Sequence, residues 1–331
     1  MKPIKAGIIG FGRMAEGHHL KAMRESGLYE VVGVCDITAS RRAAAEAAGL
    51  KATDNLNEFL DGDIELVVIA THSAQHYQGA LNSARAGKHM LIEKPMAVTA
   101  RQAEEMVAAA RDNKVVLSVY HNRHFDSDYR MVKSAVRDGL LGELIAMENR
   151  THGSQPAVKF GVPDYRQNWR ITAADGGGTL MDFGPHWIEQ ILDLMAGQKV
   201  VQVFGDVRHV RWGDADDFFK IDMIFESGTR ATAAKMDVAY YGPPYKWLIF
   251  GTEATLYAAS VRGEEVVICG SDYQLTRRKA VEAANLHVNL AECIRNGKEL
   301  IITPQHALRV MQVIQAGVDS SKAGKSIDVQ I

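Results

Sequence analysis

The chain has 331 residues, of which 47% are hydrophobic and 24% charged, and its formal net charge is -2. That length is enough for two domains, and the composition is that of an ordinary soluble globular protein with a sizeable core. The near-neutral charge excludes the basic surface that nucleic acid or an anionic membrane would require, so we expect neither partner.

The cysteines and the start of the chain favour a cytoplasmic protein. Cys35, Cys269 and Cys293 are scattered, with neither a disulfide framework nor metal-ligand spacing. The sequence has no H-E-x-x-H motif, so we expect no metal site. The first residues do not resemble a signal or transit peptide, and no run reaches the ~18 apolar residues of a membrane span.

Strand-like and helix-like segments alternate over the first 120 residues. Continuous apolar runs predict parallel strands that are covered on both faces; these are 5–10, 31–36, 65–71, 89–94 and 115–120. Helical composition lies between them, at 13–26, 38–48, 73–86 and 99–112. Thr99 with Gln102 predicts a capped helix start, and Gly27, Gly49 and Gly87 predict helix ends. Five strands and four helices predict a doubly wound parallel sheet over residues 1–122.

The pattern changes in residues 123–331, which we expect to form a second α/β domain. A helix at 127–138 and a loop-rich stretch at 153–175 precede long alternating strands. In the clearest of them, 219–226, the side chains of Phe219, Ile221, Met223 and Phe225 share one face. The alternation predicts a mostly antiparallel sheet with one face exposed to water or covered by a partner. Helices at about 281–297 and 304–317 close the chain.

The segment "AGIIGFGRMAEGHH" (6–19) joins the first strand to a glycine-rich turn. Gly10 permits the tight turn, Gly12 lets the backbone approach a pyrophosphate, and Ala15 allows close helix–strand packing. The helix N-terminus that follows favours phosphate. We therefore predict a dinucleotide site that also includes Phe11, Arg13 and Met14.

Asp36 ends the second strand, 24 residues after Gly12. A carboxylate there accepts hydrogen bonds from both ribose hydroxyls and repels a 2′-phosphate, which favours NAD over NADP. Arg41 and Arg42 lie one turn further along and would offset that preference. NAD is the expected cofactor, with NADP left open.

The fourth strand ends in "EKP", residues 93–95. Lys94 therefore faces the crevice in which such sheets bind ligands, next to a nicotinamide that is positive when oxidised. Burial there would lower the pKa of its ammonium group. On composition alone, Lys94 is explained equally well as a lysine exposed to solvent on the surface.

Three stretches together resemble the Gfo/Idh/MocA family, which includes glucose–fructose oxidoreductase and inositol dehydrogenase. They are the glycine-rich turn, "HSAQHYQGALNSARAGKHMLIEKPMAVT" (72–99) and "GGGTLMDFGPHWIE" (176–189). The E-K-P and D-x-G-x-H motifs occur in the family's order, about ninety residues apart. The resemblance implies an N-terminal Rossmann domain and a C-terminal α/β domain with a large open sheet. That sheet commonly forms oligomer contacts, so a homodimer or homotetramer is expected.

The resemblance also implies a catalytic set of Lys94, His186 and Asp182. His186 would be the general acid/base, Lys94 would contact the substrate hydroxyl and the nicotinamide ribose, and Asp182 would orient His186. The chemistry agrees, because histidine accepts a hydroxyl proton near neutrality and a lysine cation stabilises alkoxide charge. Pro185 leaves two alternatives: a helix that runs through it with a kink, or one that begins near it with Asp182 in the preceding turn.

Further contacts are assigned by the same resemblance. The expected cofactor contacts are Ala70, Thr71, His76, Glu93 and Lys94. The expected substrate contacts are Asn122, Tyr165, Trp169, Arg170 and His186. Loop packing or surface charge explains most of these residues equally well.

Three functions remain on this scaffold. The first is an NAD-dependent dehydrogenase acting on a secondary hydroxyl of a sugar, cyclitol or related polyhydroxy compound. The second is a glycoside-cleaving enzyme that oxidises its substrate transiently with bound NAD. The third is a non-catalytic NAD(P)-binding sensor, against which the presence of Lys94, Asp182 and His186 argues.

Overall fold

The computed structural model describes residues 2–156, 158, 168–259, 263–279 and 285–331. The chain forms two compact units, each assembled from three segments. The first unit contains Met1–Tyr120, Ala157–Gly176 and Ala284–Met311. The second contains His121–Pro156, Gly177–Ala283 and Gln312–Ile331. The division at residues 122 and 123 stays a prediction from the sequence.

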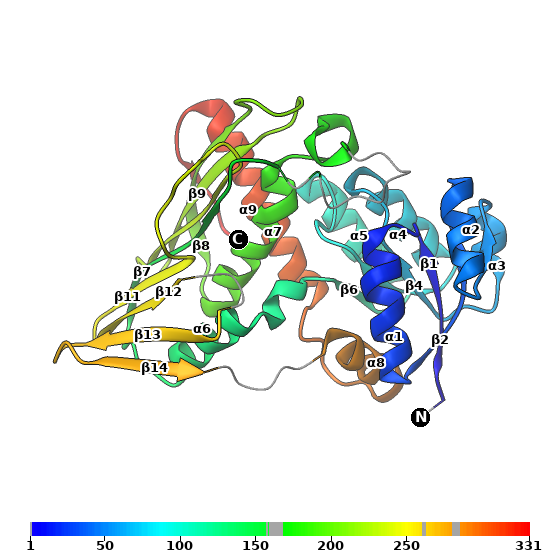
Figure 1. Ribbon diagram of the computed structural model, residues 1–331, viewed down its shortest axis with the longest axis horizontal. Coiled ribbons are helices and arrows are strands. Elements are labelled where there is room, and N and C mark those ends of the chain that lie inside the picture. The colour runs from blue at the N-terminus through cyan, green and yellow to red at the C-terminus, as the bar shows by residue number, and fades with distance from the viewer. Residues whose placement is uncertain (1, 157, 159–167, 260–262, 280–284) are drawn as a thin grey trace. The chain divides into compact units, whose positions relative to one another are not determined.

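The first unit is built on a parallel sheet (Figure 1). In the described part of the chain its order is β3-β2-β1-β4-β5-β6. The strands are β1 (Ile4–Ile9), β2 (Tyr29–Cys35), β3 (Lys51–Thr53), β4 (Leu66–Ile69), β5 (His89–Ile92) and β6 (Leu117–Val119). The order reverses between β1 and β4, and ligands bind such sheets at the carboxyl ends of the strands beside that switch point. The expected doubly wound sheet is confirmed.

Helices alternate with these strands. They are α1 (Lys21–Ser26), α2 (Ala39–Ala47), α3 (Leu56–Asp61), α4 (His76–Arg85) and α5 (Ala100–Asp112). Helix α8 (Leu286–Asn296), from much later in the chain, belongs to the same unit. The side chain of Thr99 accepts the amide of Gln102, so the capped start of α5 is confirmed. Gly27, Gly49 and Gly87 all have positive φ just beyond helices, as expected.

Two elements of the first unit were not expected. Strand β3 has three residues, none of them buried, and therefore no apolar run marks it. Helix α3 has six residues, and its N-terminus is capped by the Asn55 side chain. The first helix also differs from the continuous helix expected at 13–26, because η1 (Ala15–Leu20) is a π-helical segment that leads into α1.

The second unit carries a mostly antiparallel sheet, as predicted. Among the described residues its order is β14-β13-β12-β11-β7-β10-β9-β8-β15, and β7 and β10 pair in parallel. The strands are β7 (Leu144–His152), β8 (Val200–Arg208), β9 (Phe218–Phe225), β10 (Arg230–Met236), β11 (Trp247–Gly251), β12 (Ala254–Ala258), β13 (Glu265–Gly270), β14 (Leu275–Lys279) and β15 (Ile327–Asp328).

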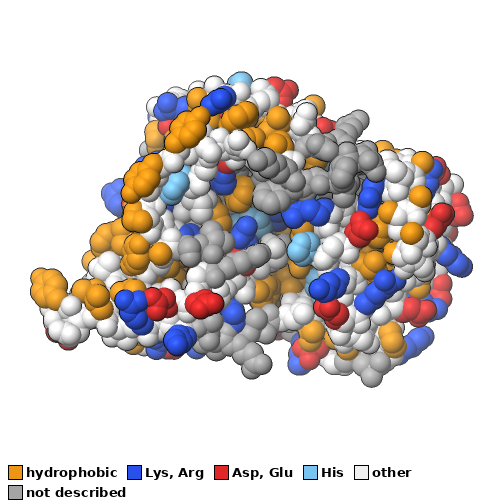
Figure 2. Space-filling view, in the orientation of Figure 1, with side chains coloured by type: hydrophobic (Ala, Val, Ile, Leu, Met, Phe, Trp, Pro, Cys, Tyr) orange, Lys and Arg blue, Asp and Glu red, His pale blue; other side chains and the backbone are white. Residues whose placement is uncertain are grey.

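The two faces of this sheet differ in burial. Residues in register form one row that is buried throughout: Val203, Met223, Ala231, Met147, Ile249, Leu256 and Ile268. The adjacent row, on the opposite face, mixes polar and apolar side chains: Phe204, Asp222, Thr232, Glu148, Leu248, Tyr257 and Val267. None of this second row is fully buried, and Figure 2 shows hydrophobic side chains along this side of the unit. The predicted alternation over 219–226 is confirmed.

Helices also belong to the second unit in the described part of the chain. They are α6 (Ser127–Arg137), α7 (Thr179–Leu194) and the second half of α9 (Pro304–Ala323). Helix α9 continues past the end expected at 317. A side chain at Gly317 would overlap Ile221, and the Gly317 backbone lies against Gly205 of β8. Gly317 therefore allows close helix–sheet contact and does not end the helix.

Candidate functional site

The glycine-rich turn has the geometry that a dinucleotide site requires. Gly10 has φ +85°, and a Cβ there would lie 2.9 Å from the backbone nitrogen of Thr71. Gly12 has open space where its Cβ would be, so the backbone is accessible there. Ala15 is buried at the start of η1, where it packs closely. The conformation of Gly10, the open space at Gly12 and the burial of Ala15 are compatible with the motif, and the binding of a dinucleotide here stays a prediction.

Asp36 is a fixed part of this turn. Its carboxylate accepts hydrogen bonds from the backbone amides of Phe11, at 2.7 Å, and of Thr38, at 2.8 Å. Each carboxylate oxygen has a further lone pair for a ribose hydroxyl. Asp36 thus holds the glycine-rich turn against the end of β2 and keeps a negative charge beside it.

Both arginines that favoured NADP are engaged within the unit. Arg41 is buried, donates from Nε to the carbonyl of Phe11 at 2.7 Å and pairs with Glu16 at 2.5 Å. Arg42 donates to the carbonyl of Asp36 at 2.9 Å and pairs with a carboxylate of the next loop, Asp54, at 3.2 Å. In this structure both guanidinium groups are therefore engaged by oxygen atoms of the protein.

The end of β4 adds polar groups beside Gly10. The amide of Ala70 continues the pairing with β1 by donating to Ile9 at 2.8 Å. Within the described residues, the Thr71 hydroxyl is buried and has no hydrogen-bond partner. A buried hydroxyl without a hydrogen-bond partner can accept or donate a hydrogen bond to a bound ligand or water molecule. With the open space at Gly12, it fits an NAD site on this chain.

The outer end of the turn is exposed. Arg13 points to the surface, and Met14 is half-buried at the start of η1. His76 was expected on the cofactor side, but both of its ring nitrogens face backbone carbonyls. Nδ1 lies 2.8 Å from the oxygen of Pro95, and Nε2 lies 3.1 Å from that of Thr71. Burial lowers the pKa of His76.

Lys94 is the second residue after β5 and is half-buried. Its backbone amide donates to the carboxylate of Glu93 at 3.2 Å. Glu93 is buried, and its other oxygen lies 3.0 Å from Nε2 of His19. Burial would raise the pKa of Glu93, but the hydrogen bond from His19 and the charge of Lys94 act against it, and the net shift is downward. Glu93 therefore contacts a histidine that lies within the first expected helix, at 13–26.

In the second unit, α7 carries both Asp182 and His186. Asp182 lies in its first turn, His186 is buried one turn later, and the helix runs through Pro185. Of the two alternatives for Pro185, the structure has the helix that runs through it. Asp182 and His186, four residues apart, therefore share one face of α7. Among aromatic neighbours, the Phe183 and Trp187 rings lie 6.5 and 6.1 Å from the His186 ring.

The start of α7 is capped by another loop. Gly178 precedes the helix at φ +111° and offers no side-chain cap. Asp216 lies between β8 and β9. Its backbone carbonyl accepts a hydrogen bond from the amide of Thr179 at 2.8 Å, and its carboxylate accepts one from the amide of Leu180 at 2.7 Å. Burial raises the pKa of Asp216 to about 7. Asp216 therefore fixes the first turn of the helix that carries His186.

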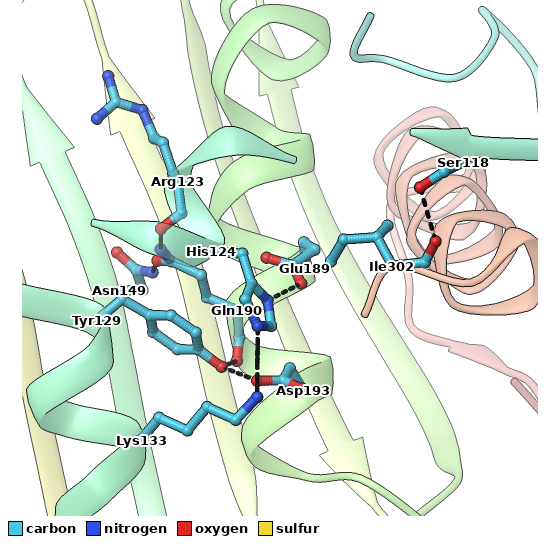
Figure 3. Close-up of polar contacts among 10 residues, drawn as sticks. All are labelled: Ser118, Arg123, His124, Tyr129, Lys133, Asn149, Glu189, Gln190, Asp193 and Ile302. Carbon is cyan, nitrogen blue, oxygen red and sulfur yellow. Dashed lines mark hydrogen bonds and ion pairs between the residues drawn. The ribbon is translucent and has the colours of Figure 1, made fainter. Parts of the chain in front are cut away.

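A buried polar network, not foreseen from the sequence, lies beneath this helix (Figure 3). His124 contacts Glu189 at 2.8 Å, and Gln190 donates to the carbonyl of Arg123 at 2.6 Å. Asn149 of β7 donates to Gln190 at 3.0 Å. These bonds tie α7 to η3 (Asn122–Phe125), on which the expected substrate contact Asn122 is half-buried.

The remaining expected contacts fall elsewhere. Trp169 and Arg170 lie on η5 (Trp169–Ile171) of the first unit, and the Arg170 guanidinium lies 4.3 Å from the centre of the Trp169 ring. Tyr165 lies outside the described residues. Lys94 belongs to the first unit, whereas Asp182 and His186 belong to the second.

Neither a membrane helix nor a metal cluster is found in the part of the chain that the structure describes. No helix there is long and apolar enough to cross a membrane. No group of three or more His, Cys, Asp or Glu side chains there is placed to hold a metal ion.

Comparison with known proteins gives two family matches. Residues 4–121 match the Gfo/Idh/MocA model described as "Oxidoreductase family, NAD-binding Rossmann fold". Residues 129–257 match a model of the Gfo/Idh/MocA C-terminal domain. The two models therefore fall on successive parts of the same chain.

Named relatives and solved structures agree. The chain is 27% identical to scyllo-inositol 2-dehydrogenase (NADP(+)) of Bacillus subtilis, over 98% of this chain and 95% of that protein. It is 33% identical to 1,5-anhydro-D-fructose reductase of Ensifer adhaerens, over 54% of this chain and 53% of that one. An NAD-binding protein from Listeria innocua has a similar structure, with a TM-score of 0.87 at 26% identity, over 99% of this chain and 97% of that one.

Proposed function

This chain belongs to the Gfo/Idh/MocA family of oxidoreductases, and from that premise we propose that it is an NAD-dependent dehydrogenase acting on a secondary hydroxyl. The substrate is a sugar, cyclitol or related polyhydroxy compound. Support for this class comes from relatives named for an inositol and for an anhydro sugar. The observation that carries the proposal is the gathering of Gly10, Asp36 and Lys94 at strand ends of an NAD-binding Rossmann unit.

The cofactor would be held by the first unit. Gly10 and Gly12 give the pyrophosphate close access to the backbone, and Asp36 accepts the hydroxyls of the adenosine ribose. Phe11, Arg13, Met14, Ala70 and Thr71 surround the same strand ends. The engagement of Arg41 and Arg42 supports NAD over NADP. When bound, NAD supplies a carbon that accepts hydride.

Lys94 and His186 handle the proton of the reacting hydroxyl in this proposal. The imidazole of His186 accepts the proton, and the Lys94 ammonium stabilises the developing charge on oxygen. Asp182, one helical turn before His186, orients the imidazole and stabilises its protonated form. Asn122, Trp169 and Arg170 are proposed to bind the other hydroxyl groups of the substrate.

Assembly and location complete the proposal. The mixed, half-exposed face of the second unit's sheet carries Phe204 and Phe250, which are 40% and 41% exposed. Exposed aromatic side chains on a sheet face are suited to contact with another subunit. We propose that this face joins copies of the chain in a homodimer or homotetramer, and that the protein works in the cytoplasm.

The first experiment is a titration of the protein with NADH and NADPH, followed by the fluorescence of its four tryptophans. Saturable binding of NADH at micromolar concentration, tighter than that of NADPH, is expected. A screen of sugars and cyclitols for NADH production then identifies the substrate. Binding of neither coenzyme would overturn the proposal. Coenzyme binding with turnover that needs no added NAD and releases an aglycone would favour the glycoside-cleaving alternative.

A further inference from the structure

The segment Glu93–Lys94–Pro95 is held on its N-terminal side by a buried histidine. Nε2 of His19 lies 3.0 Å from Oε1 of Glu93, and Oε2 of Glu93 accepts the amide of Lys94 at 3.2 Å. His19 is 0% exposed and Glu93 5%. The carboxylate therefore joins an imidazole of the first helix to the backbone of Lys94.

His19 is fixed in turn by a second histidine. Its Nδ1 lies 3.1 Å from Nε2 of His287, at the start of α8. The hydroxyl of Tyr29 donates to the His287 carbonyl at 2.5 Å, and the Tyr120 ring packs against both imidazoles. Burial lowers the pKa of His287 to about 3, so this ring is neutral.

One proton arrangement satisfies the whole chain of contacts without a buried imidazolium. Nε2–H of His287 donates to Nδ1 of His19, and Nε2–H of His19 donates to Glu93. The carboxylate then receives two hydrogen bonds, one from a ring and one from the backbone. A buried carboxylate without such donors would be costly. His19 thus supplies what Glu93 needs to stay ionised and in place.

A third histidine holds the other side of Lys94. Nδ1 of His76 lies 2.8 Å from the carbonyl oxygen of Pro95, and the ring is 1% exposed. Nε2 of His76 lies 3.1 Å from the carbonyl of Thr71, at the end of the neighbouring strand β4. The residues before and after Lys94 are therefore each fixed by a different buried imidazole.

The local backbone around His19 also departs from the regular helix. His19 lies in the π-helical segment η1, directly after the glycine-rich turn. Such segments are wider than an α-helix and are frequent at functional sites. Here the segment carries the imidazole that reaches the end of β5.

We propose that His19, acting through Glu93, and His76, acting through Pro95, are positioning residues that fix the backbone of Lys94 for reaction. Neither histidine needs to touch substrate or cofactor. The inference rests on the proposed role of Lys94 in hydroxyl oxidation. A displacement of about 1 Å in a reacting group costs roughly a hundredfold in rate, so loosening either side should lower turnover by about ten- to a hundredfold.

The test uses matched variants of the full-length protein. His19→Leu removes the donor to Glu93, whereas His19→Gln keeps an N–H near the position of Nε2. His76→Leu and His76→Asn form the corresponding pair for Pro95. His89→Leu is the control, because His89 lies at the opposite end of β5 and accepts the amide of Val116 there. Each variant is assayed for kcat, KM, NADH affinity, melting temperature and the rate of chemical acetylation of Lys94, measured by mass spectrometry.

The expected result is a loss of kcat in the two leucine variants of His19 and His76, with NADH affinity within about threefold of wild type. The amide variants should restore most of kcat, and His89→Leu should not reproduce the loss. Wild-type kcat in both leucine variants overturns the inference. So does an equal loss in leucine and amide variants that simply follows melting temperature.

The two proposals fail separately. If wild-type protein shows no dehydrogenase activity, the proposed function fails, and acetylation still decides the positioning role. An acetylation rate of Lys94 that changes in His19→Leu but not in His19→Gln supports it. Identical rates in all variants, with Lys133 acetylation as an internal reference, contradict it.

Discussion

Among the described residues, each unit contains a buried histidine–glutamate pair, and the two pairs differ in their surroundings. His19 and Glu93 of the first unit are 3.0 Å apart, and His124 and Glu189 of the second are 2.8 Å apart. The other nitrogen of His19 meets the neutral ring of His287. That of His124 lies 3.4 Å from the Lys133 ammonium and 4.0 Å from the Asp193 carboxylate.

The difference in surroundings separates two uses of the same chemistry. Burial alone would lower the pKa of His124, but Glu189 and Asp193 outweigh it and raise the pKa. The second pair is thus part of a cluster of charges that joins α6, α7 and η3. The first pair ends on the backbone amide of Lys94. We infer that the second pair stabilises the fold, whereas the first serves a reactive group.

The largest expected effect comes from the lysine beside the first pair. Lys94→Ala should lower turnover by about a thousandfold or more, because the charge that stabilises the alkoxide is lost. NADH affinity should stay within a few-fold. The matched change is Lys133→Ala beside the second pair, which should leave turnover unchanged. Steady-state kinetics with the identified substrate distinguish the two, and near-normal turnover of Lys94→Ala would remove it from the mechanism.

The second pair should give the largest effect on stability. Glu189→Leu leaves the buried His124 imidazole without its hydrogen-bonded carboxylate, while Lys133 keeps its ion pair with Asp193 at 2.7 Å, and it should cost about 3–5 kcal/mol in the free energy of unfolding. The double variant His124→Leu/Glu189→Leu should recover part of that loss. Urea unfolding measures both values. A cost below about 1 kcal/mol for Glu189→Leu would mean that the pair is not a main support of α7.

These pairs also show which features of the molecule could not be predicted from its sequence. Continuous apolar runs revealed the parallel strands, and glycine spacing revealed the dinucleotide turn. Motifs shared with the family indicated Lys94, Asp182 and His186, whose roles stay predictions. His19 and Glu93, however, are 74 positions apart, and His19 and His287 are 268 apart.

Contacts over such separations follow from the packing of the fold and leave no local pattern. The local sequence around a helical histidine does not indicate whether its side chain is exposed or buried against a carboxylate. Strand β3 was missed for a related reason, because its three residues carry no apolar signal.

The two pairs should respond to pH in opposite directions. The pKa of Glu93 is lowered in the folded protein, so its contribution to stability is present above the ordinary value of 4.5 and lost as pH falls. The pKa of His124 is raised, so its contribution is present below 6.5 and lost as pH rises through the folded value. Melting temperatures of Glu93→Gln and His124→Gln, compared with wild type from pH 4 to 9, test this. Parallel curves for both variants would contradict the contrast.

The smallest effect is expected from the ion pair of Arg41 with Glu16, whose side chain is 47% exposed. A pair so open to water contributes at most about 1 kcal/mol to stability, so its value lies in specificity. Glu16→Gln removes the charge that neutralises Arg41, and a freed guanidinium attracts a 2′-phosphate.

We expect Glu16→Gln to lower the ratio of the NADPH and NADH dissociation constants by about threefold, in keeping with an exposed pair. Tryptophan fluorescence titration measures both constants. Glu25→Gln is the control, because Glu25 pairs with Lys21 on the same helix at 3.8 Å and lies away from the turn. An unchanged ratio in Glu16→Gln would show that Arg41 stays bound to the Phe11 carbonyl and that Asp36 alone sets the preference. The exposed pair would then have no part in coenzyme specificity, in contrast to the buried pairs, which act on position and stability.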